Sequence, residues 1–398
     1  MGSTAQATTG TRRRSERGGN AGGPARTPPG GLTSRGAASL PPPGPARKVH
    51  GRRPDAGRVE RPDVGLREIE AARDTVYEVA VRTPVHRFAD PGGGEVLLKL
   101  ENLQRLGAFK IRGAWNRISR LTPAERKRGV STLSSGNHGL AVAWCARRLG
   151  IPCVVRVPEG AAPRKVEAIQ ALGAEVVPVP RTQVIRTHEE ELWRAWPETF
   201  VHPFAHPAMI EGSGTIGLEL AEGAPDVRTV LVPVGGGGLA AGVALGVKAC
   251  LPKARVFGVQ AEGAATLPTA LATKKGFHVD RPDTIADGIR VGVILPAMAE
   301  LLARTLDGCL LVSDADIRSA MRRLALEAKV VAEPAGAAGF AAWTRYREEL
   351  EPPVAVVVSG GNVDPDLLAD VLGRGPESGP REPSQPRAEG RLKYRPYR

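Results

Sequence analysis

Short apolar runs rich in β-branched residues alternate along this chain with Ala- and Leu-rich stretches of helical length. The strand-like runs occupy residues 96–100, 152–158, 174–180, 229–234, 254–260 and 354–359. The helix-like stretches occupy residues 140–150, 163–173 and 239–251. Two of these stretches end in a glycine, Gly150 and Gly173, which is typical of a helix end. The strand-like runs lack a clean alternation of apolar and polar residues, so we expect parallel strands that are buried on both faces.

This pattern predicts the α/β class, with open, doubly wound sheets. Strand–helix units near residues 130–180 and 229–260 are separated by a less regular stretch around residues 181–215. We therefore expect two α/β lobes, each built on a parallel sheet, that face each other. A fold of this kind binds its ligand at the carboxyl ends of the strands, here in the cleft between the lobes.

Both ends of the chain differ from the middle in composition. Residues 1–60 and 374–398 are rich in Gly, Pro and Arg and poor in large apolar residues, so we expect both tails to be disordered. The tails also carry the net charge of +13, because residues 1–58 contribute +9, residues 374–398 contribute +4 and the rest is neutral. Since the middle has no excess of basic residues, a nucleic-acid-binding protein is the weaker interpretation.

The cysteines and the apolar runs bear on location. Cys145, Cys153, Cys250 and Cys309 are scattered, with no CxxC pair and no zinc-type spacing, which indicates reduced thiols in a cytoplasmic protein. The N-terminal segment lacks the apolar core of a secretory signal, and its Gly and Pro content argues against an organellar transit peptide. The apolar runs fall far short of the roughly 20 residues that span a bilayer.

Four consecutive glycines, Gly235 to Gly238, follow a predicted strand and precede a predicted helix. They allow backbone N–H groups to approach a ligand closely, and the helix N-terminus adds positive charge, so the segment suits a phosphate group. The dinucleotide fingerprint fails, because Ala240 and Ala241 stand where its last glycine belongs, and no P-loop motif is present. A tight strand–helix turn is the alternative, and we favour the phosphate because four glycines are costly in entropy.

Lys110 is a candidate nucleophile. It lies between Phe109 and Ile111, after a Gly-Ala-Phe turn, in mostly apolar surroundings that could desolvate its amine. Taken by itself, a lysine in a predicted helix is more often a solvated surface group.

Two further segments place polar groups at strand ends. Residues 134–138, Ser-Ser-Gly-Asn-His, lie between a predicted strand and a predicted helix, where backbone and hydroxyl donors suit a carboxylate. An ordinary capped helix start explains the same residues and is the simpler interpretation of this segment alone. Ser359 follows a buried strand and can make one hydrogen bond, although a routine turn explains it equally well.

Together, in this order and spacing, the segments resemble the threonine/serine dehydratase and serine racemase family of fold type II pyridoxal-phosphate enzymes. The resemblance runs from about Asp74 to Leu372. The matching motifs are FKIRGA from Phe109, SSGNHG from Ser134, GSGTIGLE from Gly212, VPVGGGGLAAG from Val232, TIADGI from Thr284, EPAGAAG from Glu333 and SGGNVD from Ser359. The resemblance implies a large cofactor-binding lobe of residues 61–127 and 206–373 and a small substrate-loop lobe of residues 128–205.

The resemblance also implies a role for each candidate residue, with pyridoxal 5'-phosphate as the cofactor. Lys110 binds the cofactor covalently and acts as the base, Phe109 flanks the cofactor ring, and Asn137 contacts the ring hydroxyl. The cofactor phosphate lies on Gly235, Gly236, Gly237, Gly238 and Leu239, and Ser359 faces the pyridine nitrogen. The substrate carboxylate is held by Ser134, Ser135, Gly136, Asn137 and His138, and Ser135 is the second catalytic residue.

The implied reaction is β-elimination of L-threonine or L-serine to a 2-oxo acid and ammonium, because a serine hydroxyl at the pyridine nitrogen limits the electron sink. An amino-acid racemase or a hydroxyaspartate dehydratase on the same scaffold is the alternative, since Ser135 can protonate the opposite face of the α-carbon. We also expect a small-molecule amino-acid substrate and a homodimer or higher homo-oligomer. The family's racemase has acidic metal ligands where this chain has Gln260 and Thr266, which leaves the metal open.

Overall fold

The computed structural model describes residues 62–373. The two tails that we predict to be disordered, residues 1–60 and 374–398, lie outside the described residues.

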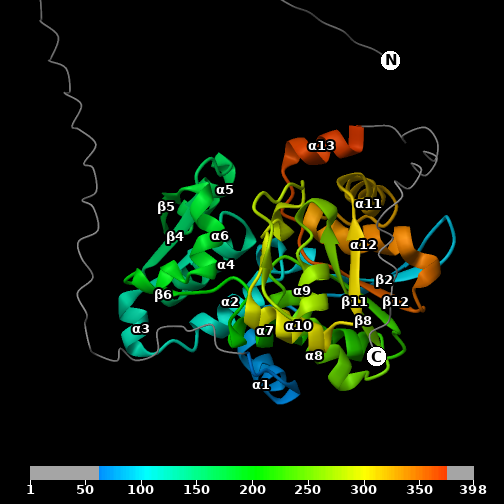
Figure 1. The fold of residues 1–398 in the computed structure, drawn as a ribbon, viewed down its shortest axis with the longest axis horizontal. Helices are drawn as coiled ribbons and strands as arrows, with labels where there is room; N and C mark the ends of the chain where they lie inside the picture. Colours follow the sequence, from blue (N-terminus) through cyan, green and yellow to red (C-terminus); the bar gives the residue numbers. More distant parts are fainter. Residues whose placement is uncertain (1–61, 374–398) are drawn as a thin grey trace, which may run out of the picture. The chain divides into compact units, whose positions relative to one another are not determined.

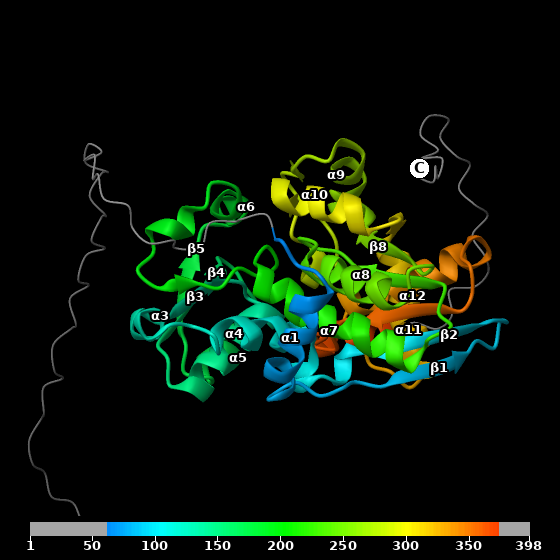
Figure 2. The ribbon, with the colours of Figure 1, turned by 90° about the horizontal axis from the view of Figure 1, so that it is seen from below.

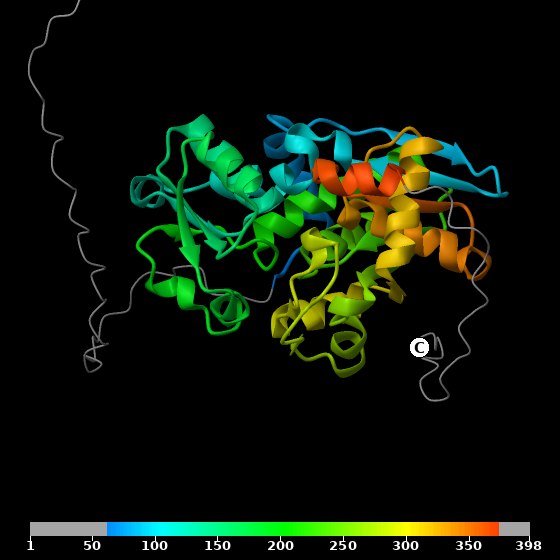
Figure 3. The same cartoon turned by 90° about the horizontal axis from the view of Figure 1, so that it is seen from above.

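Six strands form the larger sheet, in the order β1-β2-β12-β7-β8-β11. Their bounds are β1 (Val85–Ala89), β2 (Glu95–Leu100), β7 (Thr229–Pro233), β8 (Arg255–Ala261), β11 (Gly308–Val312) and β12 (Val354–Val358). All neighbours from β2 to β11 are parallel, as predicted, whereas β1 is antiparallel to β2. The β1–β2 hairpin forms one edge of this sheet (Figures 2 and 3).

Both faces of the larger sheet are buried, and strand β12 shows why its sequence does not alternate. Ala355 and Val357 point into the core beneath α7 (Pro207–Gly223) and α8 (Gly238–Cys250). Val356 and Val358 point into the opposite core, which includes apolar residues of α11 (Asp314–Leu326) and α12 (Pro334–Tyr346). Every residue of such a strand meets apolar neighbours, so a continuous apolar run is the expected sequence.

Four parallel strands form the smaller sheet, in the order β5-β4-β3-β6. Their bounds are β3 (Val130–Leu133), β4 (Cys153–Pro158), β5 (Glu175–Val179) and β6 (Thr199–Phe200). The helices of this part are α3 (Pro123–Arg128), α4 (Asn137–Leu149), α5 (Pro163–Gln170) and α6 (Arg181–Glu189) (Figure 1). Gly150 caps α4 in the left-handed conformation, at φ 64°, as the sequence predicts.

The stretch around residues 181–215 is more regular than we expect from the sequence. It contains α6, the 3-10 turn η3 (Leu192–Ala195), β6 and the start of α7. Helix α6 is mostly polar and η3 and β6 are short, so the apolar periodicity in this stretch is weak. The division into lobes at residues 128 and 205 stays a prediction, although all four strands of the smaller sheet fall between those two positions.

The remaining elements fill the flanks of the two sheets. The helices are α1 (Leu66–Tyr77), α2 (Lys110–Ile118), α9 (Leu267–Thr273), α10 (Pro296–Thr305) and α13 (Pro365–Gly373). The short strands β9 (Phe277–His278) and β10 (Val293–Ile294) pair antiparallel, and the other 3-10 turns are η1 (Glu101–Leu103), η2 (Arg105–Gly107), η4 (Glu262–Ala264), η5 (Asp287–Ile289) and η6 (Arg347–Glu349). Helix α1 lies beside α7, which is far from it in sequence (Figures 1 and 2).

Two further findings concern the cysteines and the length of the helices. All four cysteines have free thiols, as predicted. In the described residues 62–373, no helix has the length and apolar character needed to cross a membrane.

Candidate active site

Lys110 is the first residue of α2, and its amine is partly withdrawn from water. Its Nζ donates a hydrogen bond to the backbone oxygen of Pro203 at 2.8 Å and lies 5.0 Å from the ring centroid of Phe109. Burial lowers the pKa of Lys110 to about 8, and the negative charge of Glu333 opposes that shift. The predicted nucleophile therefore has a substantial uncharged fraction near neutral pH.

Ser359 lies beside the turn that carries Lys110. The backbone N–H of Phe109 donates to the carbonyl oxygen of Ser359 at 3.1 Å, and Ala108 forms an isolated antiparallel bridge with Gly360. Ser359 follows β12 directly and is only 4% exposed. The structure thus brings together two predicted site residues that are about 250 positions apart in the chain.

A buried ion cluster anchors α2 two residues after Lys110. Arg112 pairs with Glu101 at 2.7 Å and with Glu219 at 2.6 Å, and Lys99 pairs with Glu219 at 2.5 Å. Two bases and two acids balance, and all four side chains are at most 3% exposed. The motif from Gly212 to Glu219 supplies one of the acids, and its small residues let α7 approach α2 closely. Each charge would be costly to bury alone, so the four side chains must stay in contact. Because Arg112 belongs to α2, these contacts fix the position of the start of that helix.

The four glycines connect β7 to α8 and pack against residues from other segments. A Cβ at Gly236 would lie 2.4 Å from the ring of Phe204, and a Cβ at Gly238 would lie 2.6 Å from the carbonyl oxygen of Phe204. Gly237 has a φ of +96°, which disfavours any other residue. The first N–H groups of α8 have no acceptor within the helix and are available to an anion. Close packing and a phosphate site are therefore both compatible with these glycines.

Leu239 is buried against the large core, so its side chain is a packing group and only its backbone N–H is free to bind a ligand. Phe204 follows Pro203, which accepts the hydrogen bond from Lys110. The segment 203–204 therefore joins the lysine to the four-glycine turn.

The loop from Ser134 to Gly136 connects β3 to α4. The hydroxyl oxygen of Ser134 accepts a hydrogen bond from the backbone N–H of Gly136 at 3.2 Å, which closes a tight turn. A Cβ at Gly136 would meet nothing within 4 Å, so this turn is open on one side. Ser135 lies in the same turn and is partly exposed.

His138 is turned away from solvent. It is 2% exposed, its Nε2 lies 3.0 Å from the carbonyl oxygen of Val201, and burial lowers its pKa to about 3. The imidazole is therefore neutral, and its Nε2 is hydrogen-bonded to Val201, directly after β6. It supplies no positive charge to a substrate carboxylate, and its Nδ1 is a buried atom without a hydrogen-bond partner among the described residues.

Asn137 connects the smaller sheet to two residues that we did not predict as site residues. Its Nδ2 donates to Oε1 of Glu333 at 2.7 Å, and its Oδ1 accepts from Nδ2 of Asn362 at 2.8 Å. Glu333 opens the EPAGAAG motif, and Asn362 lies in the SGGNVD motif that begins at Ser359. Glu333 precedes a proline at a helix start, which marks an N-cap position, and that signal alone suggests only a structural role.

Glu333 is 5% exposed and acts as the N-cap residue of α12. Burial and the neighbouring charge of Asp287 raise its pKa to about 7, against the opposing effects of Asn137, Lys165 and Lys110. Lys165 of α5 forms an ion pair with Asp287 close by. A carboxyl group that titrates near neutral pH beside a lysine with a lowered pKa is typical of a functional site.

Gln260 and Thr266 bond to each other. Nε2 of Gln260 donates to the hydroxyl of Thr266 at 3.0 Å, and its Oε1 accepts the backbone N–H groups of Thr266 and Leu267 at 2.9 and 2.7 Å. The pair caps the start of α9. Within residues 62–373, no group of three His, Cys, Asp or Glu side chains is arranged to hold a metal ion.

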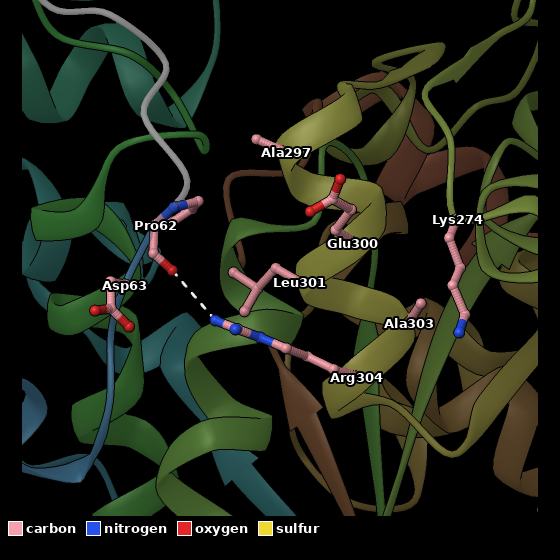
Figure 4. A pocket seen from close by; sticks show the side chains of 8 residues that line it. All are labelled: Pro62, Asp63, Lys274, Ala297, Glu300, Leu301, Ala303 and Arg304. Atoms are coloured by element: carbon pink, nitrogen blue, oxygen red, sulfur yellow. Dashed lines mark hydrogen bonds between the residues drawn. The ribbon is translucent and has the colours of Figure 1, made fainter.

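A cavity of about 730 Å³ lies elsewhere, beside α10 (Figure 4). It is bordered by Glu300, Leu301 and Arg304, and the Arg304 guanidinium donates to the carbonyl oxygen of Pro62 at 3.4 Å. Its described lining contains none of the predicted site residues, so it has no part in the site around Lys110.

Known proteins resemble this chain over most of the described residues. The family model described as "pyridoxal-phosphate dependent enzyme" matches residues 77–360. An L-threonine ammonia-lyase of Thermotoga maritima is 39% identical over 318 residues, which cover 78% of this chain and 79% of the relative. An L-threo-3-hydroxyaspartate ammonia-lyase of Saccharomyces cerevisiae is 35% identical over 314 residues, which cover 78% of this chain and 96% of the relative.

The fold agrees with that of a solved relative. A maize serine racemase has a TM-score of 0.71 and 32% identity, covering 78% of this chain and 97% of its own. The family match spans the predicted lysine, the serine-rich loop and the four glycines. The resemblance that the motifs predict is confirmed, and the chain belongs to the family of pyridoxal-phosphate-dependent enzymes.

Proposed function

We propose that this protein is a threonine/serine ammonia-lyase that converts L-threonine to 2-oxobutanoate and ammonium, and L-serine to pyruvate and ammonium. The observation that carries the proposal is the buried amine of Lys110, with a pKa of about 8, joined through Pro203 and Phe204 to a glycine turn at a helix N-terminus. Relatives that are 35–39% identical and named for L-threonine ammonia-lyase or dehydratase activity support it.

The residues present fit pyridoxal phosphate. The backbone N–H groups from Gly235 to Leu239 suit its phosphate, Lys110 suits its carbonyl carbon, and the hydroxyl of Ser359 suits its pyridine nitrogen. When bound, the cofactor accepts electron density from the α-carbon of an amino acid. Ser359 offers a hydrogen bond without a full charge, which favours elimination over reactions that need a longer-lived carbanion.

We assign Lys110 as the base that takes and holds the proton from the α-carbon of the substrate. Its lowered pKa of about 8 leaves roughly a tenth of the amine uncharged at pH 7 and about half at pH 8, and the uncharged form is the one that acts as a base. The loop from Ser134 to His138 is assigned to bind the substrate carboxylate through backbone N–H and hydroxyl groups, with no contribution from the imidazole. Asn137 is assigned to the ring hydroxyl of the cofactor.

The second candidate function is racemisation of an amino acid, or dehydration of hydroxyaspartate, on the same scaffold. The similarity to a serine racemase and to a hydroxyaspartate ammonia-lyase favours it, and Ser135 is the residue assigned to the second face of the α-carbon. The Ser135→Ala variant separates racemisation from elimination, because elimination requires no group on that face, and a comparison of the two substrates separates threonine from hydroxyaspartate dehydration.

The test is a 2-oxo-acid assay on protein reconstituted with pyridoxal phosphate, using L-threonine, L-serine and L-threo-3-hydroxyaspartate. Chiral analysis of the remaining serine reports racemisation in the same samples. We expect L-threonine to be turned over, and we expect Lys110→Ala to abolish turnover. Absence of 2-oxobutanoate with a fully loaded enzyme would overturn the assignment to threonine.

We further propose that the protein acts in the cytoplasm as a homo-oligomer, without nucleic-acid or membrane partners. Three large apolar side chains support a contact surface near η1, since Val81, Leu103 and Val331 are 45%, 57% and 46% exposed. Hydrogen bonds from Gln104 to Val81 and from Asn102 to Val331 hold these segments together. Sedimentation velocity of the wild type and of Leu103→Asp tests the proposal, because a monomeric wild type would contradict it.

A further inference from the structure

The amide of Asn137 lies between two residues of distant segments. Asn137 opens α4 beside the smaller sheet, Glu333 stands at the N-cap position of α12, and Asn362 follows β12 of the larger sheet. Both polar atoms of the Asn137 side chain are engaged, Nδ2 with Glu333 at 2.7 Å and Oδ1 with Asn362 at 2.8 Å. The amide is thus held from both sides by side chains outside its own helix.

These partners allow only one orientation of the amide. An ionised carboxylate only accepts hydrogen bonds, so Glu333 selects the Nδ2 side of Asn137. Asn362 presents its own Nδ2, and the second hydrogen of that group is donated to the carbonyl oxygen of Leu106 at 2.7 Å. A flipped Asn137 would set oxygen against oxygen at Glu333 and nitrogen against nitrogen at Asn362.

The carboxylate of Glu333 has little room to move. A Cβ at Gly360 would lie 2.3 Å from its Oε1, and a Cβ at Gly288 would lie 3.6 Å from the same atom. These two glycines lie in the SGGNVD and TIADGI motifs. The contact with Glu333 explains why residue 360 lacks a side chain, whereas at Gly288 the close contact is with Cβ of Ala335 at 2.9 Å, and Glu333 is confined as well as buried.

These contacts use only one of the two hydrogens on Nδ2 of Asn137. The Nδ2 group of an asparagine carries two hydrogens, and Glu333 takes one of them from Asn137. We propose that Glu333 and Asn362 are positioning residues, which orient the Asn137 amide so that its remaining Nδ2 hydrogen is donated to the ring hydroxyl oxygen of the cofactor. The inference rests on the proposed contact between Asn137 and the cofactor, and it assigns a role to two residues outside that contact.

The charges around Glu333 bear on the pH at which the orientation holds. Lys110 of α2, Lys165 of α5 and Asp287 of η5 face it, and its pKa is raised to about 7. Below that pH the carboxyl group gains a proton and can itself donate, so its preference for the Nδ2 side of Asn137 weakens. The positioning effect is therefore expected to be full at pH 8 and reduced at pH 6.

The test measures the dissociation constant of pyridoxal phosphate for the full-length apoprotein by equilibrium dialysis at pH 8. Glu333→Ala and Asn362→Ala each remove one anchor of the amide, and we expect each to weaken binding about five- to tenfold, the worth of one oriented hydrogen bond. Glu333→Gln keeps an acceptor at the same place but can also donate, so its loss of affinity should be smaller than that of Glu333→Ala and similar to that of the wild type at pH 6. Glu262→Gln, a change at an exposed glutamate of η4, is the matched control and should have no effect.

The outcomes separate the inference from the proposed function. A wild type that does not bind pyridoxal phosphate contradicts the proposed function itself. A wild type that binds, with Glu333→Ala and Asn362→Ala unchanged, overturns the inference alone. Glu333→Gln that is as weak as Glu333→Ala also overturns it, because charge and not amide orientation would then be responsible. If Glu333→Ala does not fold, as judged by circular dichroism, the exposed Asn362 position decides the question.

Discussion

The ring of Phe204 occupies the space into which a side chain at Gly236 would project. The nearest ring atom lies 2.4 Å from the position of such a Cβ, well inside any contact distance found in proteins. The glycine is therefore required by packing alone, whatever ligand the turn binds. Phe204 in turn follows Pro203, the acceptor of the Lys110 amine, so a disturbance at Gly236 reaches the lysine through two adjacent residues.

We expect Gly236→Ala to displace Phe204 and to lower the free energy of unfolding by about 1–3 kcal/mol, the usual range for overpacking. Urea unfolding of the apoprotein measures the loss. Combining Gly236→Ala with Phe204→Leu should restore part of the stability, because the smaller side chain relieves the clash. If the double variant is no more stable than the sum of the single changes predicts, the ring is not the obstacle.

Replacing Lys110 by Met should stabilise the apoprotein. The folded state lowers the pKa of Lys110 from 10.5 to about 8, so it disfavours the charged amine that the unfolded chain carries. The resulting penalty is roughly 2–3 kcal/mol below pH 8 and disappears as the pH rises toward 10.5. Urea unfolding from pH 6.5 to 10 should therefore show a gap between Lys110→Met and wild type that narrows with pH. A gap that does not change with pH would contradict the burial of the amine.

Acid should destabilise the region around the smaller sheet through its buried histidines. Burial is the main cause that lowers the pKa of His138 to about 3 and of His188 and His206 to about 4. A group whose pKa is lowered on folding contributes stability above its unfolded pKa of 6.5, and this is lost as the pH falls. Each histidine should cost roughly 2 kcal/mol of unfolding free energy between pH 7.5 and pH 5.

Urea unfolding at the two pH values checks this expectation. His188→Phe should reduce the acid loss, because it removes one titrating group from a site where the ring already packs against Phe200 and Phe204. His86→Gln, at an exposed position on β1, is the control and should leave the loss unchanged. Equal acid sensitivity of His188→Phe and wild type would show that these histidines do not control it.

Removing one member of the buried ion cluster should lower the free energy of unfolding far more than removing an acid and a base together. Arg112→Met leaves Glu101 and Glu219 buried with less compensation, and we expect a loss of about 3–5 kcal/mol. Adding Glu101→Gln to Arg112→Met restores the charge balance and should recover part of the loss. Thermal unfolding of both variants checks this, and an additive double variant would contradict electrostatic coupling within the cluster.

The sequence predicts several buried strands of this fold because their burial is complete, but the 17-residue helix α7 is not among the helices that it predicts. Strands β7 and β12 are apolar on both faces, and their runs are visible without any structure. Strands β6, β9 and β10 have two residues each, too few to produce a pattern. The antiparallel strand β1, Val-His-Arg-Phe-Ala, buries only Phe88, and the pairing that defines it comes from β2 rather than from a pattern in its own residues.

The sequence predicts only those residues of the candidate site to which the family resemblance assigns a role. Lys110, Asn137 and Ser359 belong to recognisable motifs, so their proximity is expected and is found around Phe109 and Glu333. Glu333 also opens a motif, EPAGAAG, but a carboxylate before a proline suggests only a helix cap, so the motif does not mark it as a site residue. Its role depends on burial and on the approach of Asn137, and neither property can be derived from local sequence.

The position of β12 in the larger sheet has a consequence for how the protein is made. Strands β2 and β7 are complete by residue 233, yet they do not pair with each other, and the gap between them is filled only by residues 354–358. A growing chain on the ribosome therefore exposes two apolar strand edges until nearly all of it has been translated. Because Ser359 meets the Lys110 turn at the same step, a polypeptide cut short before residue 354 has its lysine and its glycine turn but neither a closed sheet nor a finished site. We therefore expect such a fragment to bind chaperones or be degraded rather than to be partly active.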